Sequence, residues 1–245
     1  MRTRPGAAVS GFSYAGRDFS PYVQAELEEP AAHALEPRAL AVPGRPGALL
    51  LGCELPPREV RLRLHLDAGS QMRACELSRL RALLRAWLCA PGGDLVVPGE
   101  GALTWRDAVV TGVSDWDTLF EGGSCAVDFT CYDPVAYGAA RSCTGTELEV
   151  LGTWPTLPVM TLTAAAGPAV KVTDGGGRYV LVERDLSAGD EVVMDFAAES
   201  VTVGGEDASA DVGVGSTFFS LPPGAHALTF FGCSAHEVAW TERWL

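Results

Sequence analysis

The sequence predicts a mainly β protein with one prominent helix, in which an N-terminal α+β domain precedes a C-terminal β-sandwich. Three observations predict it. The 28 glycines and 16 prolines fall in short clusters between runs of Val, Thr and Leu, which is typical of turns that join short strands. One long stretch has helical spacing, and about eight strand-like segments follow one another in the second half. At 245 residues the chain is long enough to bury two modest cores.

The first half opens with elements of β type. Residues 11–18, Gly-Phe-Ser-Tyr-Ala-Gly-Arg-Asp, alternate aromatics and then reach a turn, which predicts a hairpin. After an irregular, acidic stretch, residues 42–47 (Val-Pro-Gly-Arg-Pro-Gly) predict a tight loop. Residues 58–66 alternate strictly, with Val and Leu on one face and Arg61, Arg63 and a histidine on the other. This is the clearest strand of the chain.

A helix is predicted after this strand. Between Met72 and Leu88 the apolar residues recur at spacings of three and four, while most arginines fall elsewhere, which indicates an amphipathic helix of about five turns. Ala-Pro-Gly-Gly at 90–93 ends it. The apolar stripe is assigned to the core, because membrane-surface helices need the basic surroundings that this acidic chain lacks. Strands are expected next at 94–97, 103–113 and 125–132.

The second half reads as a sandwich of short strands. A composition shift at 138–156 places the domain boundary there, so the domains are predicted at 1–143 and 144–245. Glycine-rich turns separate the strand-like segments at a spacing of about ten residues, which is typical of a jelly-roll-like sandwich. The segments are 159–163, 169–173, 179–183, 191–196, 200–203, 218–221, 227–231 and 237–244.

The net charge also differs between the two predicted domains. Residues 1–143 carry 14 Arg against 17 Asp and Glu, a net charge of −3, whereas residues 144–245 carry 4 Lys and Arg against 14 acids, a net charge of −10. An acidic half disfavours nucleic-acid recognition and anionic membranes, because neutralising phosphates needs clustered Arg or Lys. No run of 18 apolar residues predicts membrane insertion.

The seven cysteines predict free thiols. Their number is odd, they are widely spread and they form no C-x-x-C pair. Cys125 and Cys131 share one predicted strand, where about 3.3 Å per residue puts them about 20 Å apart, beyond disulfide reach. The spacing predicts neither a zinc site nor any other metal site.

No catalytic, cofactor or metal motif is found, so the chain is predicted not to be an enzyme. It has no G-x-S-x-G elbow and no phosphate-binding glycine loop. His236-Glu237 begins like H-E-x-x-H, but Trp240 stands where the second histidine would be. A glycan-binding surface is an alternative, since an exposed Trp can stack on a sugar ring. Its candidates are Trp154, Trp240 and Trp244, whose strand contexts also fit core packing.

Taken in order along the chain, short motifs resemble the distal tail protein (Dit) family of siphophages, whose members link the tail tube to the tail tip. The resemblance covers nearly the whole chain and depends on the order of the motifs, since no single one is specific. The motifs are Gly11-Phe12-x-Tyr14-x-Gly16, Val42-Pro43-Gly44-Arg45, the strand at 58–66, Ala86-Trp87-Leu88, Phe129-x-Cys131-x-Asp133-Pro134, Trp154-Pro155-x-x-Pro158, Ser216-x-Phe218, Leu221-x-Pro223-Gly224 and Arg243-Trp244-Leu245. Pro46 and His226 depart from the family pattern.

The resemblance implies a structural role in a virion. Residues 1–143 would form the ring domain, with six copies closing a hexamer around the tail channel, and the second domain would be a galectin-like sandwich outside the ring. The implied partners are the tail tube protein and the tail-tip or tail-associated proteins. The implied location is the tail tip, after assembly in the cytoplasm of the bacterial host. An active phage, a prophage and a phage-like tail device all remain open.

Five arginines are candidates for the contacts between subunits of such a ring. Arg45 lies at the tip of a predicted loop, Arg61 and Arg63 on the outer face of a strand, and Arg81 and Arg85 on the predicted helix. Each is also explained by simple solvation. A ring needs head-to-tail contacts between unlike surfaces, and the near balance of Arg and acids in the first domain supplies pairing partners.

Overall fold

The computed structural model describes residues 8–9, 11–28, 34–66, 74–97, 102–121 and 123–245. The chain forms two compact units, residues 1–136 and Tyr137–Trp244, called here the first and second units. The predicted boundary at 143/144 lies at the far end of strand β11 (Ala136–Cys143), which pairs with β21 (Cys233–Trp244) of the second unit. The predicted fold class, mainly β with one prominent helix, is confirmed.

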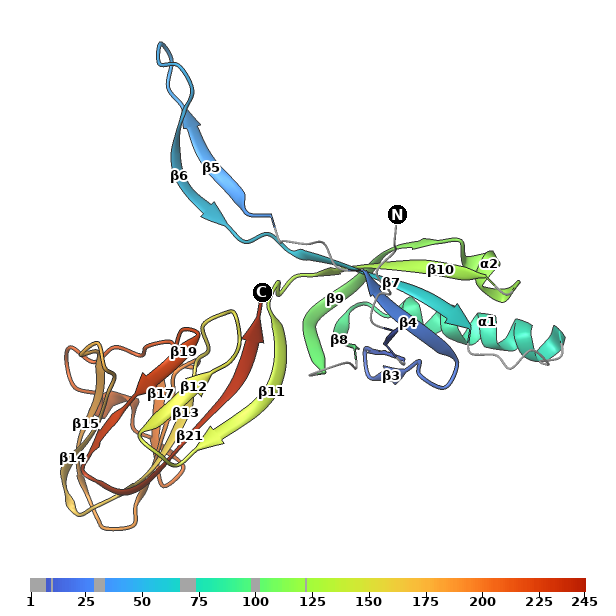
Figure 1. The fold of residues 1–245 in the computed structure, drawn as a ribbon. Helices are drawn as coiled ribbons and strands as arrows, with labels where there is room; N and C mark the ends of the chain where they lie inside the picture. Colours follow the sequence, from blue (N-terminus) through green and yellow to red (C-terminus); the bar gives the residue numbers. More distant parts are fainter. Residues whose placement is uncertain (1–7, 10, 29–33, 67–73, 98–101, 122) are drawn as a thin grey trace. The chain divides into compact units, whose positions relative to one another are not determined.

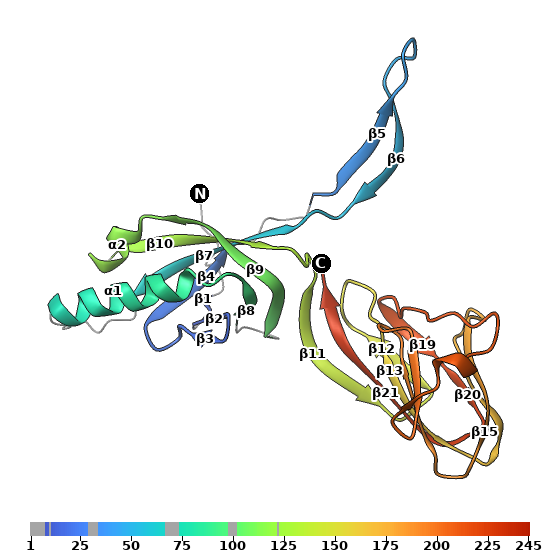
Figure 2. The same ribbon diagram turned by 180° about the vertical axis from the view of Figure 1, so that it is seen from behind.

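The first unit is built on an antiparallel sheet (Figures 1 and 2). Its strands run in the order β1, β4, β7, β10, β9, and β9 continues through β8 to the small β2–β3 hairpin. The predicted strand at 58–66 and the hairpin at 11–18 are both present, and Val60, Leu62 and Leu64 are buried as their alternation predicts. The bounds are Ala8–Val9 for β1, Ser13–Tyr14 for β2, Arg17–Asp18 for β3, Val23–Glu28 for β4, Arg58–Leu66 for β7, Gly93–Val97 for β8, Leu103–Ser114 for β9 and Ser124–Cys131 for β10.

Two helices accompany this sheet. The predicted helix is α1 (Ala74–Leu88), whose buried Leu80, Leu84 and Leu88 form the apolar stripe. At its end the Trp87 ring lies 5.3 Å from that of Phe19 in an edge-to-face contact. Met72 lies outside the described residues. A short helix, α2 (Trp116–Phe120), follows β9, where the sequence analysis expected no helix.

An isolated hairpin interrupts the first unit. Strands β5 (Glu36–Ala41) and β6 (Ala48–Glu54) pair with each other and with no other strand of the described part of the chain, and the predicted loop at 42–47 is their turn (Figure 1). We call residues 36–54 the arm. Nearly all of its side chains are exposed, including Leu40, Leu50 and Leu51, which are 51%, 66% and 69% exposed.

The second unit is a β-sandwich. One sheet runs β11, β21, β13, β16, β17, β18, the other runs β15, β14, β20, and β12 pairs with β19. Inward residues of both sheets form one core that includes Met160, Val172, Val182, Met194 and Val238. The remaining bounds are Glu147–Val150 for β12, Val159–Ala164 for β13, Gly167–Thr173 for β14, Tyr179–Leu186 for β15, Glu191–Asp195 for β16, Ser200–Val203 for β17, Glu206–Asp207 for β18, Gly224–Ala227 for β19 and Thr229–Phe231 for β20, with a 3₁₀ turn at Ser209–Asp211.

Two predicted strands of this unit differ in the structure. The strand expected at 218–221 is wrong, because that segment forms only an isolated bridge from Leu221 to Thr156 while Phe218 and Phe219 pack on Phe196. The strand expected at 227–231 is split between β19 and β20. A single residue, Gly232, with a φ of 77°, then joins β20 of one sheet to β21 of the other.

All seven cysteines are free, and their environments differ. Burial raises the pKa of the Cys125 thiol to about 11 and that of the Cys131 thiol to about 12. We expect Cys53, Cys75 and Cys89, which are exposed, to be alkylated within minutes at pH 8, and Cys125 and Cys131 to react only after denaturation, since the thiolate is the nucleophile. Mass mapping after a timed iodoacetamide pulse measures this order. Early labelling of Cys131 would contradict the burial of β10.

No helix in the described ranges is long and apolar enough to cross a membrane.

Candidate functional site

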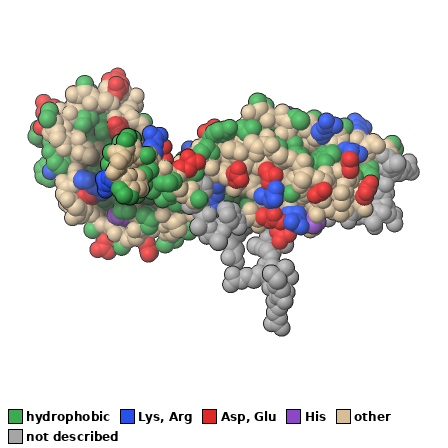
Figure 3. Space-filling model, turned by 90° about the horizontal axis from the view of Figure 1, so that it is seen from above, with side chains coloured by type: hydrophobic (Ala, Val, Ile, Leu, Met, Phe, Trp, Pro, Cys, Tyr) green, Lys and Arg blue, Asp and Glu red, His purple; other side chains and the backbone are tan. Residues whose placement is uncertain are grey.

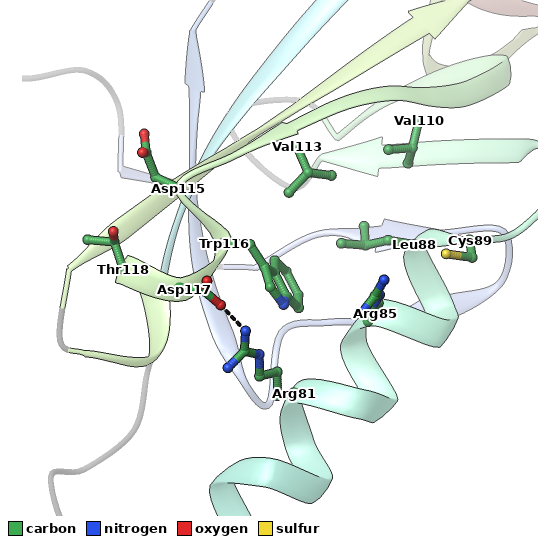
Figure 4. A pocket seen from close by; sticks show the side chains of 10 residues that line it. All are labelled: Arg81, Arg85, Leu88, Cys89, Val110, Val113, Asp115, Trp116, Asp117 and Thr118. Carbon is green, nitrogen blue, oxygen red and sulfur yellow. Dashed lines mark hydrogen bonds and ion pairs between the residues drawn. The ribbon is translucent and has the colours of Figure 1, made fainter.

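A cavity of about 680 Å³ lies in the first unit between α1, β9 and α2 (Figure 4). We call it the helix cavity. Its apolar lining comes from Leu88, Val110 and Val113, and its polar lining from α1 and from the segment 115–118. The polar side chains are those of Arg81, Arg85, Asp115, Trp116, Asp117 and Thr118. The two arginines are among those predicted from the sequence to contact neighbouring subunits.

The polar groups of this cavity are only partly paired with each other. Arg81 forms an ion pair with Asp117, drawn as a dashed line in Figure 4. Among the described residues Arg85 and Asp115 have no ion-pair partner, and Asp115 has a left-handed backbone with a φ of 56°. The buried indole nitrogen of Trp116 also lacks a hydrogen-bond partner there. The Arg85 guanidinium and the Asp115 carboxylate, both exposed, are therefore available to a partner, whereas the buried indole N–H is not.

The two strand arginines are paired within the chain. Arg61 donates to Asp128 through Nε at 2.5 Å and through Nη2 at 3.0 Å, and Arg63 contacts Glu28 at 2.7 Å. The hydrogen bond from Arg61 lowers the pKa of Asp128. Basic and acidic side chains lie side by side on the surface in Figure 3. This face is therefore largely charge-balanced and not a basic patch.

Arg45 lies in the turn of the arm and is exposed. Its backbone N–H donates to the carbonyl of Val42 at 3.1 Å, which closes the turn. No ion pair holds its guanidinium within the described part of the chain, so it is available to another molecule.

The three candidate tryptophans have different surroundings. Trp240 is only 8% exposed, and its indole nitrogen donates to Glu242 at 3.1 Å, so its ring faces are turned into the protein. Trp154 forms a bridge with Arg243 and is partly buried, as is Trp244. The three rings therefore do not form one exposed surface on which a sugar could stack.

His236 and Glu237 alternate on β21, where His236 is partly buried and Glu237 exposed. Over the described ranges no group of three or more His, Cys, Asp and Glu side chains is placed to hold a metal ion.

The comparisons with known proteins point to phage tails. Residues 151–244 match the family model described as siphovirus-type tail component, C-terminal domain. The crystal structure of the SPP1 Dit protein, described as a paradigm of hub adsorption apparatus in phages that infect Gram-positive bacteria, superposes with a TM-score of 0.76 at 16% identity and covers 96% of this chain and 99% of that one. A phage P2 baseplate structure gives a TM-score of 0.44 at 9% identity over 89% of this chain and 90% of that one. No curated protein matches the chain.

Proposed function

We propose that six copies of this chain close into a ring that joins the tail tube to the tail tip. The premise is the assignment of the chain to the distal tail protein family, which rests on its tail component domain and on the fold it shares with the SPP1 Dit protein. The chain is a structural component of a phage tail, and the resemblance seen in the sequence is confirmed. The proposed ring adds an oligomeric state and a position within the tail to this assignment.

The exposed apolar surface of the arm is the main support for the ring proposal. Its exposed leucines have no use in the isolated chain, because a two-stranded hairpin with both faces in water buries little apolar surface. In the proposal the arm packs on the first unit of the next copy. A contact between two unlike surfaces is heterologous, and repeating it around an axis closes a ring.

Charges supply the specificity of this contact. Arg45 on the arm and Arg85 in the helix cavity are free of ion-pair partners among the described residues, and Asp115 offers a free carboxylate. In the proposal Arg85 and Arg45 bind acids of neighbouring copies, whereas Arg81, already paired with Asp117, lies at the contact as part of a charge-balanced surface. Arg61 is paired with Asp128, and Arg63 with Glu28. Because an ion pair within the chain partly compensates the positive charge, these two arginines belong in the proposed ring to a charge-balanced surface and not to a strong contact with a neighbour.

The remaining partners follow from the same proposal. One side of the ring binds the tail tube protein and the other the tail-tip or tail-associated proteins, after assembly in the cytoplasm of the host. The second unit lies outside the ring, where its acidic surface disfavours adhesion to DNA. Neither nucleic-acid sequence recognition nor membrane insertion is part of this role, which is structural and not catalytic.

The test is the mass and shape of the assembled protein. Native mass spectrometry and negative-stain imaging of the full chain, alone and mixed with its tail tube protein, should show six copies around a central hole. Including the tube protein matters, because a ring that needs a template stays monomeric alone. A chain that remains monomeric in both preparations would contradict the proposal.

A further inference from the structure

A second cavity, of about 540 Å³, lies in the second unit, where β12 and β19 meet β20 and β21. We call it the sandwich-edge cavity. Its volume lies within the roughly 300–1,000 Å³ that small-molecule sites typically have. The side chains that matter here are those of Thr146, Glu147, Thr229, Phe230, Ser234 and His236.

Two rings from different sheets form one wall of this cavity. Phe230 of β20 is paired in register with Val172, and His236 of β21 is paired with Leu162. Both of those partners are fully buried, and side chains of paired residues lie on the same face, so both rings point into the sandwich. They meet in a parallel stack, with centroids 3.8 Å apart and planes inclined by 15°. The stack fixes the orientation of the imidazole.

The imidazole carries an unused polar atom. Nε2 of His236 is buried and has no hydrogen-bond partner among the described residues. A neutral imidazole has one donor and one acceptor nitrogen, and a buried polar atom without a partner is costly. A ligand hydroxyl that reaches Nε2 through a small shift of the ring would satisfy it with either tautomer, because a hydroxyl both donates and accepts.

The rim adds hydroxyls and one carboxylate. Thr146 and Thr229 are exposed, and the Ser234 hydroxyl, which donates to the carbonyl of Thr163 at 3.2 Å, keeps its acceptor capacity. The carboxylate of Glu147 is exposed and forms no ion pair within the described part of the chain. Neither Lys nor Arg lines the cavity. One negative charge without a cation disfavours phosphates and carboxylates as ligands.

We propose that the sandwich-edge cavity binds a neutral saccharide unit. A sugar ring offers hydroxyls to Glu147, His236 and the rim, and an apolar face to Phe230, so that each kind of lining group has a counterpart. The site lies on residues other than the three tryptophans considered from the sequence. It goes beyond the ring role and gives the second unit contact with a glycan.

The test uses the full chain and a panel of neutral sugars. Titration with glucose, galactose and N-acetylglucosamine by calorimetry is expected to show saturable binding of at least one. Glu147→Gln should weaken it about tenfold, because a hydrogen bond to a charged acceptor becomes a weaker one to a neutral amide oxygen. Glu149→Gln is the matched control, since this exposed residue lies on the same face of β12 but outside the cavity, and it should leave the affinity unchanged.

Three results would overturn the proposal. The first is that none of these sugars binds at about 10 mM. The second is that a sugar binds but that Glu147→Gln and Thr229→Val both leave its affinity unchanged. The third is that the cavity binds a lysine-rich peptide in place of a sugar. Both variants change exposed side chains, so they should fold. Failure here leaves the ring proposal standing, because the ring is measured by mass and not by sugar binding.

Discussion

Replacing residues 36–54 by a short Gly-Ser turn should leave a folded protein that no longer closes into a ring. The arm contributes almost nothing to the core, since its side chains are exposed, so the free energy of unfolding should change little. If the leucines of the arm are buried against the next copy, each contributes roughly 1.5–3 kcal/mol, and their loss should weaken association at least about a hundredfold. Light scattering after size exclusion, with the tube protein present, measures this.

A substitution variant sharpens the arm prediction. Changing Leu40, Leu50 and Leu51 to Ser keeps the hairpin and removes only its apolar surface, so it should abolish the ring as the deletion does. Val214→Ser is the matched control, because Val214 is a fully exposed apolar residue of the second unit. Rings that form normally from the triple variant would show that the arm is not the contact that closes them.

Glu242→Ala should destabilise the second unit by about 3–5 kcal/mol. Glu242 is only 2% exposed, and its carboxylate accepts hydrogen bonds from the backbone N–H of Gly152 at 2.7 Å and from the indole N–H of Trp240 at 3.1 Å. Alanine would leave both buried donors without an acceptor, and each bond to a charged group is worth roughly 1.5–3 kcal/mol. Chemical denaturation followed by tryptophan fluorescence measures the loss.

Two companion variants test this reason. Glu237→Ala changes an exposed acid on the same strand and should shift the free energy of unfolding by less than about 0.5 kcal/mol. Glu242→Gln keeps one acceptor oxygen and should recover part of the lost stability. A loss below about 1 kcal/mol for Glu242→Ala would mean that the two donors find other acceptors.

Elements with a strict period could be predicted from the sequence, and elements without one could not. The strand at 58–66 and helix α1 each bury one face, so their periods of two and of three to four are visible. The arm has both faces in water, so burial imposes no alternation on it, and only its turn was found. Around 218–221 an apolar pair suggested a strand, but Phe219 is buried by packing on Phe196 and not by a sheet.

The candidate sites were harder to predict because they join distant segments. Arg61 and Arg63 looked like free cations, since their partners Asp128 and Glu28 lie on other strands. The sandwich-edge cavity draws on residues from Thr146 to His236, and no motif links them. His236 was noticed only through the dipeptide with Glu237, whereas its stacking on Phe230 is visible only in three dimensions.

The single-residue crossing at Gly232 sets a limit on how the sandwich can come apart. A Cβ at this position would lie 2.2 Å from the carbonyl oxygen of Ala169. The main chain therefore packs directly on the backbone of β14 where it crosses from one sheet to the other. With so short a tether, one layer cannot peel away while the other stays intact. Loss of structure in the second unit should therefore be all-or-none, with a single cooperative transition and no state in which one sheet has melted alone.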